Sequence, residues 1–236
     1  MRMVVLKAGG NVIYPRESNH IDRDFLQSLG RFVELHLLQH YECVVLVPGG
    51  IGGELFIKWG RQEGCTEPEL DEVGCALIDI SALIISRALR SNLSDRGLVS
   101  PTVPKTLDSL SQALGKYKII VAGCAIPHAL TSDSLAASIA EHASADLKLV
   151  KGSKPFGGES SFYEDAACHT ISLARLLAYH ASLKEIEKAG HYPSLDYLCL
   201  RIIRRAKLPS TIVLKDSVVE WRPGVEVQEI AINHES

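Results

Sequence analysis

The chain has 236 residues, of which 46% are hydrophobic and 22% charged, a composition that excludes disordered, collagen-like and repeat-dominated proteins. Its 25 basic and 28 acidic residues give a formal net charge of −3, so a nucleic acid partner is not expected. No apolar stretch reaches membrane-spanning length, and the six cysteines lack the C-x-x-C spacing of metal or redox sites. We therefore expect a cytoplasmic protein that associates with no membrane.

Strand-like runs alternate with helical patterns along the chain. Strand Met3–Leu6 leads into a Gly9-Gly10 turn, and an apolar stripe from Leu26 to Leu37 predicts the first helix. The remaining predicted elements are, in order, strand Cys43–Val47, helix Glu69–Arg90, a short strand Leu98–Val103, strand Lys118–Val121, helix Ser134–His142 with Ser132 or Asp133 as its N-cap, strand Leu147–Val150, helices Glu164–Tyr179 and Leu195–Ala206, strand Thr211–Leu214 and an alternating tail Val225–Ile230.

Near-continuous apolar strands between amphipathic helices are typical of a mostly parallel sheet that is covered on both faces. The pattern therefore predicts an α/β fold, a three-layer α/β/α sandwich around such a sheet. We expect the whole chain, residues 1–236, to form a single domain. In sheets of this kind, ligands bind at the carboxyl ends of the strands.

Two glycine-rich turns follow the first two predicted strands. Lys7-Ala-Gly9-Gly10 offers backbone N–H groups and a mobile positive charge to an anion, although a tight turn with an incidental lysine would look the same. Pro48-Gly49-Gly50-Ile51-Gly52-Gly53 supplies a second flexible loop. In a parallel sheet the two turns would face one crevice, which could take two phosphate-bearing ligands.

The segment Thr131-Ser132-Asp133-Ser134 precedes a predicted helix. Its hydroxyl and carboxylate groups suit a helix N-cap. A second interpretation is that Asp133 points into the crevice, pairs with Lys7 and helps to hold the metal of a bound nucleotide. The two interpretations are compatible, because a helix start is itself an anion site.

These motifs together resemble the amino acid kinase family, in particular its uridylate kinase-like members. The resemblance rests on KAGG after the first strand, PGG after the second, and TSDSLAASIAEHASADLKLV, and it spans roughly residues 3 to 151. The TSDSLA stretch and the compact length are most similar to the small kinases of methanofuran biosynthesis. The stretch Tyr192-Pro-Ser-Leu-Asp-Tyr-Leu198 also resembles the molybdenum storage protein.

The resemblance implies a small-molecule kinase that uses ATP and Mg²⁺ to phosphorylate a phosphate- or carboxylate-bearing metabolite. Catalysis would rest on Lys7 and Asp133, which would bind the nucleotide together with Gly9, Gly10 and Ser132, whereas Gly49, Gly50 and Gly52 would approach the acceptor. In such a site the rate comes from positioning and charge neutralisation.

Four further residues are candidates for the site. Lys58 stands where related kinases have an acceptor-binding arginine, and His128 precedes Asp133 at the mouth of the crevice, where a structural role is equally open. Lys151 and Lys154 stand where the family normally has an Asp-Gly-Val segment. They would either contact the nucleotide phosphates or belong to a solvated loop. No H-x-x-H or H-E-x-x-H spacing predicts a transition-metal centre.

The resemblance also implies an organisation for the whole molecule. Residues 1–130 would form an acceptor-binding lobe, with specificity in loops such as Gly53–Leu70, and residues 131–236 a nucleotide-binding lobe. A homo-oligomer, either dimer or hexamer, is expected, and the apolar face Val73–Ile84 suits a subunit interface as well as the core. Two alternatives remain open: a nucleotide-binding protein that stores an oxyanion such as molybdate or tungstate, and a kinase-like regulator without catalytic activity.

Overall fold

The computed structural model describes residues 1–15, 20–126, 131–152, 170–182 and 195–234. Within these residues, one sheet has seven strands in the order β3-β2-β1-β4-β6-β7-β5. Neighbouring strands are parallel except for β6 and β7, which are antiparallel. The strands are β1 (Met3–Ala8), β2 (Cys43–Pro48), β3 (Ile119–Val121), β4 (Asp146–Lys151), β5 (Thr170–Ser172), β6 (Ser210–Leu214) and β7 (Glu229–Asn233).

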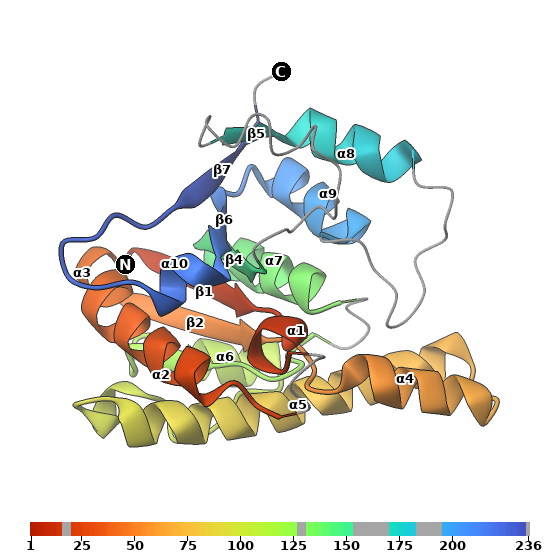
Figure 1. Cartoon of the computed structure of the whole chain (residues 1–236), viewed down its shortest axis with the longest axis horizontal. Coiled ribbons are helices and arrows are strands. Elements are labelled where there is room, and N and C mark those ends of the chain that lie inside the picture. The colour runs from red at the N-terminus through yellow and green to blue at the C-terminus, as the bar shows by residue number, and fades with distance from the viewer. Residues whose placement is uncertain (16–19, 127–130, 153–169, 183–194, 235–236) are drawn as a thin grey trace.

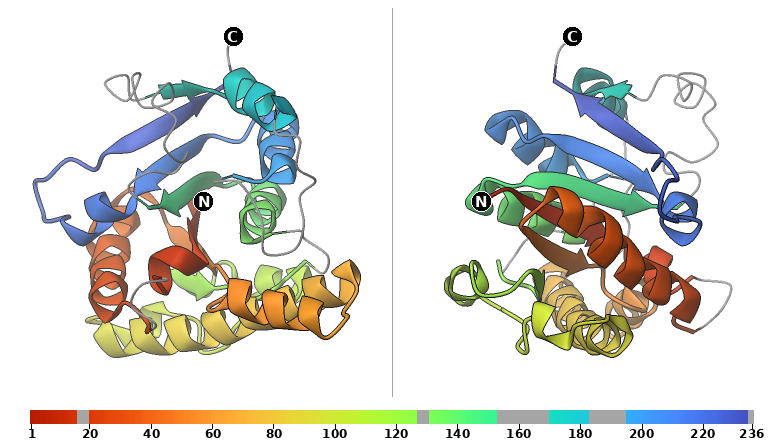
Figure 2. Two further views of the ribbon diagram at one scale, coloured as in Figure 1. Left: turned by 45° about the vertical axis from the view of Figure 1, so that its right-hand side comes forward. Right: turned by 90° about the vertical axis from the view of Figure 1, so that its left-hand side faces the viewer.

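Helices cover both faces of this sheet (Figure 1), which confirms the predicted sandwich. Figure 2 shows α2 (Arg23–Phe32) and α10 (Lys215–Val219) on one side, and α7 (Ser132–Ala143), α8 (Leu173–Ser182) and α9 (Tyr197–Ala206) on the other. The other helices are α1 (Gly10–Ile13), the π-helical turn η1 (Val33–Leu37), α3 (Leu38–His40), α4 (Gly53–Gln62), α5 (Glu67–Asn92), the 3₁₀ turn η2 (Arg96–Leu98) and α6 (Leu107–Ala113). Over the described ranges, no helix is long and apolar enough to cross a membrane.

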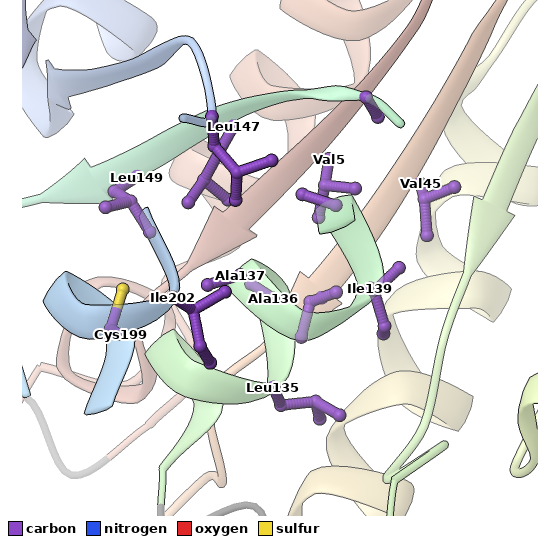
Figure 3. Packing of buried hydrophobic residues seen from close by; sticks show 14 of the residues in the cluster. Val5, Val45, Leu135, Ala136, Ala137, Ile139, Leu147, Leu149, Cys199 and Ile202 are labelled. Atoms are coloured by element: carbon purple, nitrogen blue, oxygen red, sulfur yellow. The ribbon is translucent and has the colours of Figure 1, made fainter. Parts of the chain in front are cut away.

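The packing of α7 on the sheet brings the start of this helix to the carboxyl ends of β1 and β4. Val5 of β1 and Leu147 and Leu149 of β4 project toward α7, where they meet Ala136 and Ala137 (Figure 3). All five side chains are fully buried. Because alanine is small, the helix axis can lie close to the strands, and such close packing is sensitive to added volume.

Some predicted elements differ from the structure in the first half of the chain. The stretch Gly53–Leu70, expected as a loop, contains α4. Gly52, the residue before this helix, has a left-handed backbone conformation with φ +68. The prediction of a strand at Leu98–Val103 was wrong: this stretch has the turn η2 and an isolated bridge between Val99 and Ile119. Proline cannot donate a ladder hydrogen bond, and two prolines follow the bridge.

Two elements near the C-terminus also differ. The predicted helix Glu164–Tyr179 begins only at Leu173, because Thr170–Ser172 form strand β5, and residues 164–169 lie outside the described ranges. Two β-branched residues in Thr170-Ile-Ser favour an extended chain over a helix. The alternating tail predicted at Val225–Ile230 contributes to β7 only from Glu229 onward.

The two glycine turns that follow β1 and β2 contact each other through their backbones. The Gly49 N–H donates a hydrogen bond to the Ala8 carbonyl at 2.7 Å. A β-carbon on Gly49 would collide with the Gly10 nitrogen, and one on Gly10 would lie 2.6 Å from the Gly50 carbonyl oxygen. Glycine at positions 10 and 49 is therefore required by the close approach of the turns to one another.

We expect Gly49→Ala to lower the free energy of unfolding by about 1–3 kcal/mol, because the added methyl group meets backbone that no side-chain rotation can move. Gly53→Ala is the matched control, since a β-carbon at Gly53 has no atom within 4 Å. The control should change stability by less than about 0.5 kcal/mol. Urea-induced unfolding of both variants measures the difference, and parental stability in Gly49→Ala would contradict the explanation.

Candidate functional site

Three buried charged side chains meet at the carboxyl ends of β1 and β4. Lys7 lies near the end of β1, Lys151 is the last residue of β4, and Asp133 lies in the first turn of α7. Because side chains alternate along a strand, Lys7 shares a face with Val5, and Lys151 shares that face with Leu149. This is the face that α7 covers. We call Lys7, Asp133 and Lys151 the charged cluster.

One carboxylate holds both lysines of the charged cluster. Lys7 Nζ lies 2.5 Å from Asp133 Oδ1, and Lys151 Nζ lies 2.6 Å from Asp133 Oδ2. The three side chains are at most 11% exposed. With both amines protonated, these three side chains carry two positive charges and one negative charge. Two fixed ammonium groups at the carboxyl ends of parallel strands suit an anionic ligand.

The burial of the cluster shifts the pKa values of its members. Burial alone would raise the pKa of Asp133, but attraction to Lys151 and Lys7 outweighs it and lowers the pKa to about 2. For Lys151, burial lowers the pKa, attraction to Asp133 opposes this effect, and repulsion from Lys7 adds to it. Asp133 therefore stays ionised at neutral pH, while Lys151 is a weaker base than an exposed lysine.

The start of α7 places Asp133, although its N-cap differs from the prediction. The sequence predicts Ser132 or Asp133 as the cap, but the cap is Thr131. Its Oγ1 accepts hydrogen bonds from the Asp133 and Ser134 N–H groups at 3.1 and 3.2 Å. Because Thr131 satisfies these amides, the Asp133 carboxylate is free of a capping role and pairs with the lysines instead.

The first glycine turn adjoins the charged cluster, and the second turn lies against the first. A β-carbon on Gly9 would lie 3.3 Å from Lys7 Nζ, so the first turn runs beside that ammonium group. The second turn is fixed to α5, because the Ile51 N–H donates to Ser81 Oγ at 2.8 Å. Sequence reasoning missed Ser81, which is a small polar residue inside an apolar helix pattern and has no motif around it.

The other predicted site residues have different environments. Ser132, the first residue of α7, is half-buried, and Gly52 is the N-cap of α4. Lys58 is exposed on α4, and no hydrogen bond or ion pair joins it to the cluster within the described part of the chain. His128 and Lys154 lie outside the described residues. The structure therefore brings together Lys7, Asp133, Lys151 and the two turns.

A resident metal site is not formed by the residues that the structure describes. Among them, no three His, Cys, Asp or Glu side chains are close enough together to hold a metal ion. Both Asp133 oxygens are already paired with lysines. Magnesium commonly binds through one or two carboxylates together with substrate phosphates. The geometry thus fits an ion that is carried by a phosphate ligand better than an ion held by the protein.

Comparison with known proteins gives relatives that match most of the chain. No family model matches the chain. A uridylate kinase of Methanocaldococcus jannaschii is 31% identical over 213 residues, covering 89% of each chain. A uridylate kinase of Methanococcoides burtonii is 26% identical over 213 residues, covering 89% of this chain and 86% of its own length.

Solved structures share the fold. The uridylate kinase of Archaeoglobus fulgidus superimposes with a TM-score of 0.68 at 22% identity, covering 96% of this chain and 98% of its own. The UMP kinase of Bacillus anthracis also gives 0.68, at 15% identity and 98% and 99% coverage. With its charged cluster, its paired glycine turns and these relatives, the chain belongs to the amino acid kinase family as a uridylate kinase-like small-molecule kinase.

Proposed function

We propose that this protein transfers a phosphoryl group from ATP to a small phosphate-bearing acceptor, with uridine monophosphate as the first acceptor to test. The observation that carries the proposal is the pair of buried ammonium groups, Lys7 and Lys151, that one carboxylate holds at the carboxyl ends of β1 and β4. The choice of acceptor is supported by the relatives, which are uridylate kinases. The wider class of phosphate- or carboxylate-bearing metabolites stays a prediction.

The charged cluster suits phosphoryl transfer for an electrostatic reason. In this reaction negative charge spreads over the transferring group, and enzymes stabilise it with fixed positive charges and backbone donors rather than with a nucleophile. Lys7 and Lys151 would supply the charges, and Asp133 would keep the two ammonium groups in place against their mutual repulsion. Because the groups are fixed before the substrate arrives, little reorganisation is needed at the moment of transfer.

The two glycine turns would divide the ligands between them. Gly9 runs beside the Lys7 ammonium group. Gly9 and Gly10 would contact the phosphates of ATP, together with Ser132 and Lys154. Gly49, Gly50 and Gly52 would approach the acceptor, with Lys58 and His128 as further acceptor contacts. In this proposal residues 1–130 form the acceptor-binding lobe, whose first glycine turn also reaches the ATP phosphates, and residues 131–236 form the nucleotide-binding lobe. Mg²⁺ would enter on the nucleotide phosphates and neutralise part of their charge.

The alternatives from the sequence gain no support. The relatives are uridylate kinases rather than oxyanion-storage proteins or regulators. The charged cluster keeps the two lysines and the carboxylate that a transfer reaction uses. We therefore propose no second function.

We also propose that the protein is a homo-oligomer assembled through the outer face of α5. On this helix Ile80 and Leu83 are 50% and 54% exposed, whereas Leu77 is buried. The predicted apolar face Val73–Ile84 is thus divided between core and surface. Apolar side chains that gather on one exposed helix face commonly mark a contact with another protein.

The first prediction from the proposed function concerns turnover. Lys7→Met and Lys151→Met should each lower kcat for ATP and uridine monophosphate by roughly 100- to 1,000-fold, because each variant lacks one fixed positive charge that would stabilise the transition state. Lys148→Met is the matched control: Lys148 is a buried lysine of β4 on the opposite face, paired with Glu229 at 2.5 Å. The control should keep the parental kcat.

A coupled assay of ADP release measures these rates, with thermal unfolding to confirm that each variant is folded. A parent protein that neither binds Mg·ATP nor releases ADP with any phosphate-bearing acceptor would overturn the proposed function.

The second prediction concerns pH. Burial lowers the pKa of Lys151, so Lys151 should lose its proton, and the cluster one of its two positive charges, as the pH rises through the alkaline range. We expect Mg·ATP to bind progressively more weakly as the pH rises through the alkaline range, at values below those at which an exposed lysine loses its proton. Lys151→Arg should bind with a flatter pH dependence, because a guanidinium group keeps its proton. Isothermal titration measures both proteins, and parallel pH profiles would contradict the assignment.

The third prediction concerns assembly. Leu83→Glu should shift the protein toward the monomer, because a charge in an apolar interface loses its hydration. Leu35→Glu is the control, since Leu35 is a 42% exposed leucine of η1 outside the proposed interface. Light scattering coupled to gel filtration measures the mass of both. A monomeric parent, or the same shift in both variants, would contradict the proposed interface.

A further inference from the structure

We propose that Asp196 is a positioning residue, which fixes the start of α7 so that Asp133 lies between Lys7 and Lys151. The role of these three residues in phosphoryl transfer rests on the proposed function. Asp196 acts on the charged cluster through Thr131 and Ser134, the residues that flank Asp133 at the start of the helix.

The Asp196 carboxylate joins the N-termini of two helices. Asp196 is the N-cap of α9, and its Oδ1 accepts a hydrogen bond from the Cys199 N–H at 2.7 Å. Its Oδ2 accepts from the Ser134 N–H of α7 at 3.1 Å and from the Thr131 hydroxyl. The residue is 1% exposed. A cap requires only one oxygen, so the second oxygen has a separate task, which is to hold α7.

The hydrogen bond from Thr131 is the step that links Asp196 to Asp133. A threonine hydroxyl has one hydrogen and two lone pairs. Because the Thr131 hydroxyl donates its hydrogen to Asp196, its lone pairs are directed to the Asp133 and Ser134 N–H groups. Asp196 therefore sets the orientation of the hydroxyl that fixes the backbone of Asp133.

The charged cluster is sensitive to such positioning. Both Asp133 oxygens contact a lysine, at 2.5 and 2.6 Å, so a movement of the Asp133 backbone lengthens at least one of the two contacts. A displacement of about 1 Å in a catalytic constellation can cost a factor of roughly 100 in rate. Asp196 also carries a negative charge where two helix N-termini converge, an arrangement that stabilises the carboxylate and the junction.

The test replaces Asp196 with asparagine, because asparagine and aspartate are about equally effective as helix N-caps. In Asp196→Asn the amide oxygen can still accept from Cys199, but the NH₂ group faces the Ser134 N–H, a donor against a donor. We expect kcat to fall roughly 10- to 100-fold, while KM for uridine monophosphate and Kd for Mg·ATP stay within about threefold. Asp196→Ala should lose as much kcat and more thermal stability.

Asp22→Asn is the matched control. Asp22 is also a side-chain N-cap of a ten-residue helix, α2, and accepts from the Phe25 N–H at 2.8 Å. Its variant should keep kcat within about twofold, since a cap outside α7 does not place Asp133. A parental kcat in Asp196→Asn, with loss only in Asp196→Ala, would show that Asp196 is merely a cap and would overturn the proposal. Equal losses in Asp196→Asn and Asp22→Asn would also overturn it.

Amide hydrogen exchange separates this proposal from the proposed function. In Asp196→Asn the Asp133 and Ser134 amides should exchange faster, whereas the Cys199 amide should keep its protection. Unchanged exchange at the start of α7 would refute the positioning role. If the parent phosphorylates no acceptor, the proposed function fails, and the exchange experiment still decides whether Asp196 fixes Asp133.

Discussion

Two buried ammonium groups, those of Lys7 and Lys151, share the Asp133 carboxylate in this protein. The start of α7 and its packing on the sheet hold this carboxylate between them. Like charges repel strongly where water is excluded. Asp133 offsets that repulsion with one oxygen for each lysine. Its position depends on a helix start that is closed by Thr131 and on alanines that let α7 lie close to the strands. Helix capping, core packing and the electrostatics of the site are therefore parts of one arrangement.

The glycine turns have a structural task beside the proposed ligand contacts. Gly10 and Gly49 stand where the backbones of neighbouring turns touch, so a side chain at either position would separate β1 from β2 at their carboxyl ends. A glycine motif at a strand end can thus arise from contact between two turns. The fold therefore requires these two glycines before any phosphate is bound.

Local sequence patterns were sufficient for much of the sheet and for one half of the charged cluster. The apolar runs predicted β1, β2 and β4, and the pairing of Asp133 with Lys7 was one of two compatible interpretations of the segment before α7. Whether Lys151 belongs to the cluster stayed open, because the apolar run that predicted β4 ends at Val150. From the sequence alone, a lysine at the end of a strand cannot be distinguished from a lysine at the start of a loop. The role of Asp196 depends on Ser134, 62 residues away in the chain, and a contact of that separation cannot be read from local spacing.

The alternation of side chains along β4 has a consequence for how the strand finds its partners. Lys148 and Lys151 are both buried, face opposite layers, and have separate carboxylate partners in Glu229 and Asp133. Sliding β4 by one residue would turn each ammonium group into the wrong layer, away from its carboxylate. Apolar residues stand on both faces of this strand and would tolerate such a slip, whereas unpaired buried charges cost several kcal/mol each. The two lysines therefore specify the register of the strand as well as the charge of the site.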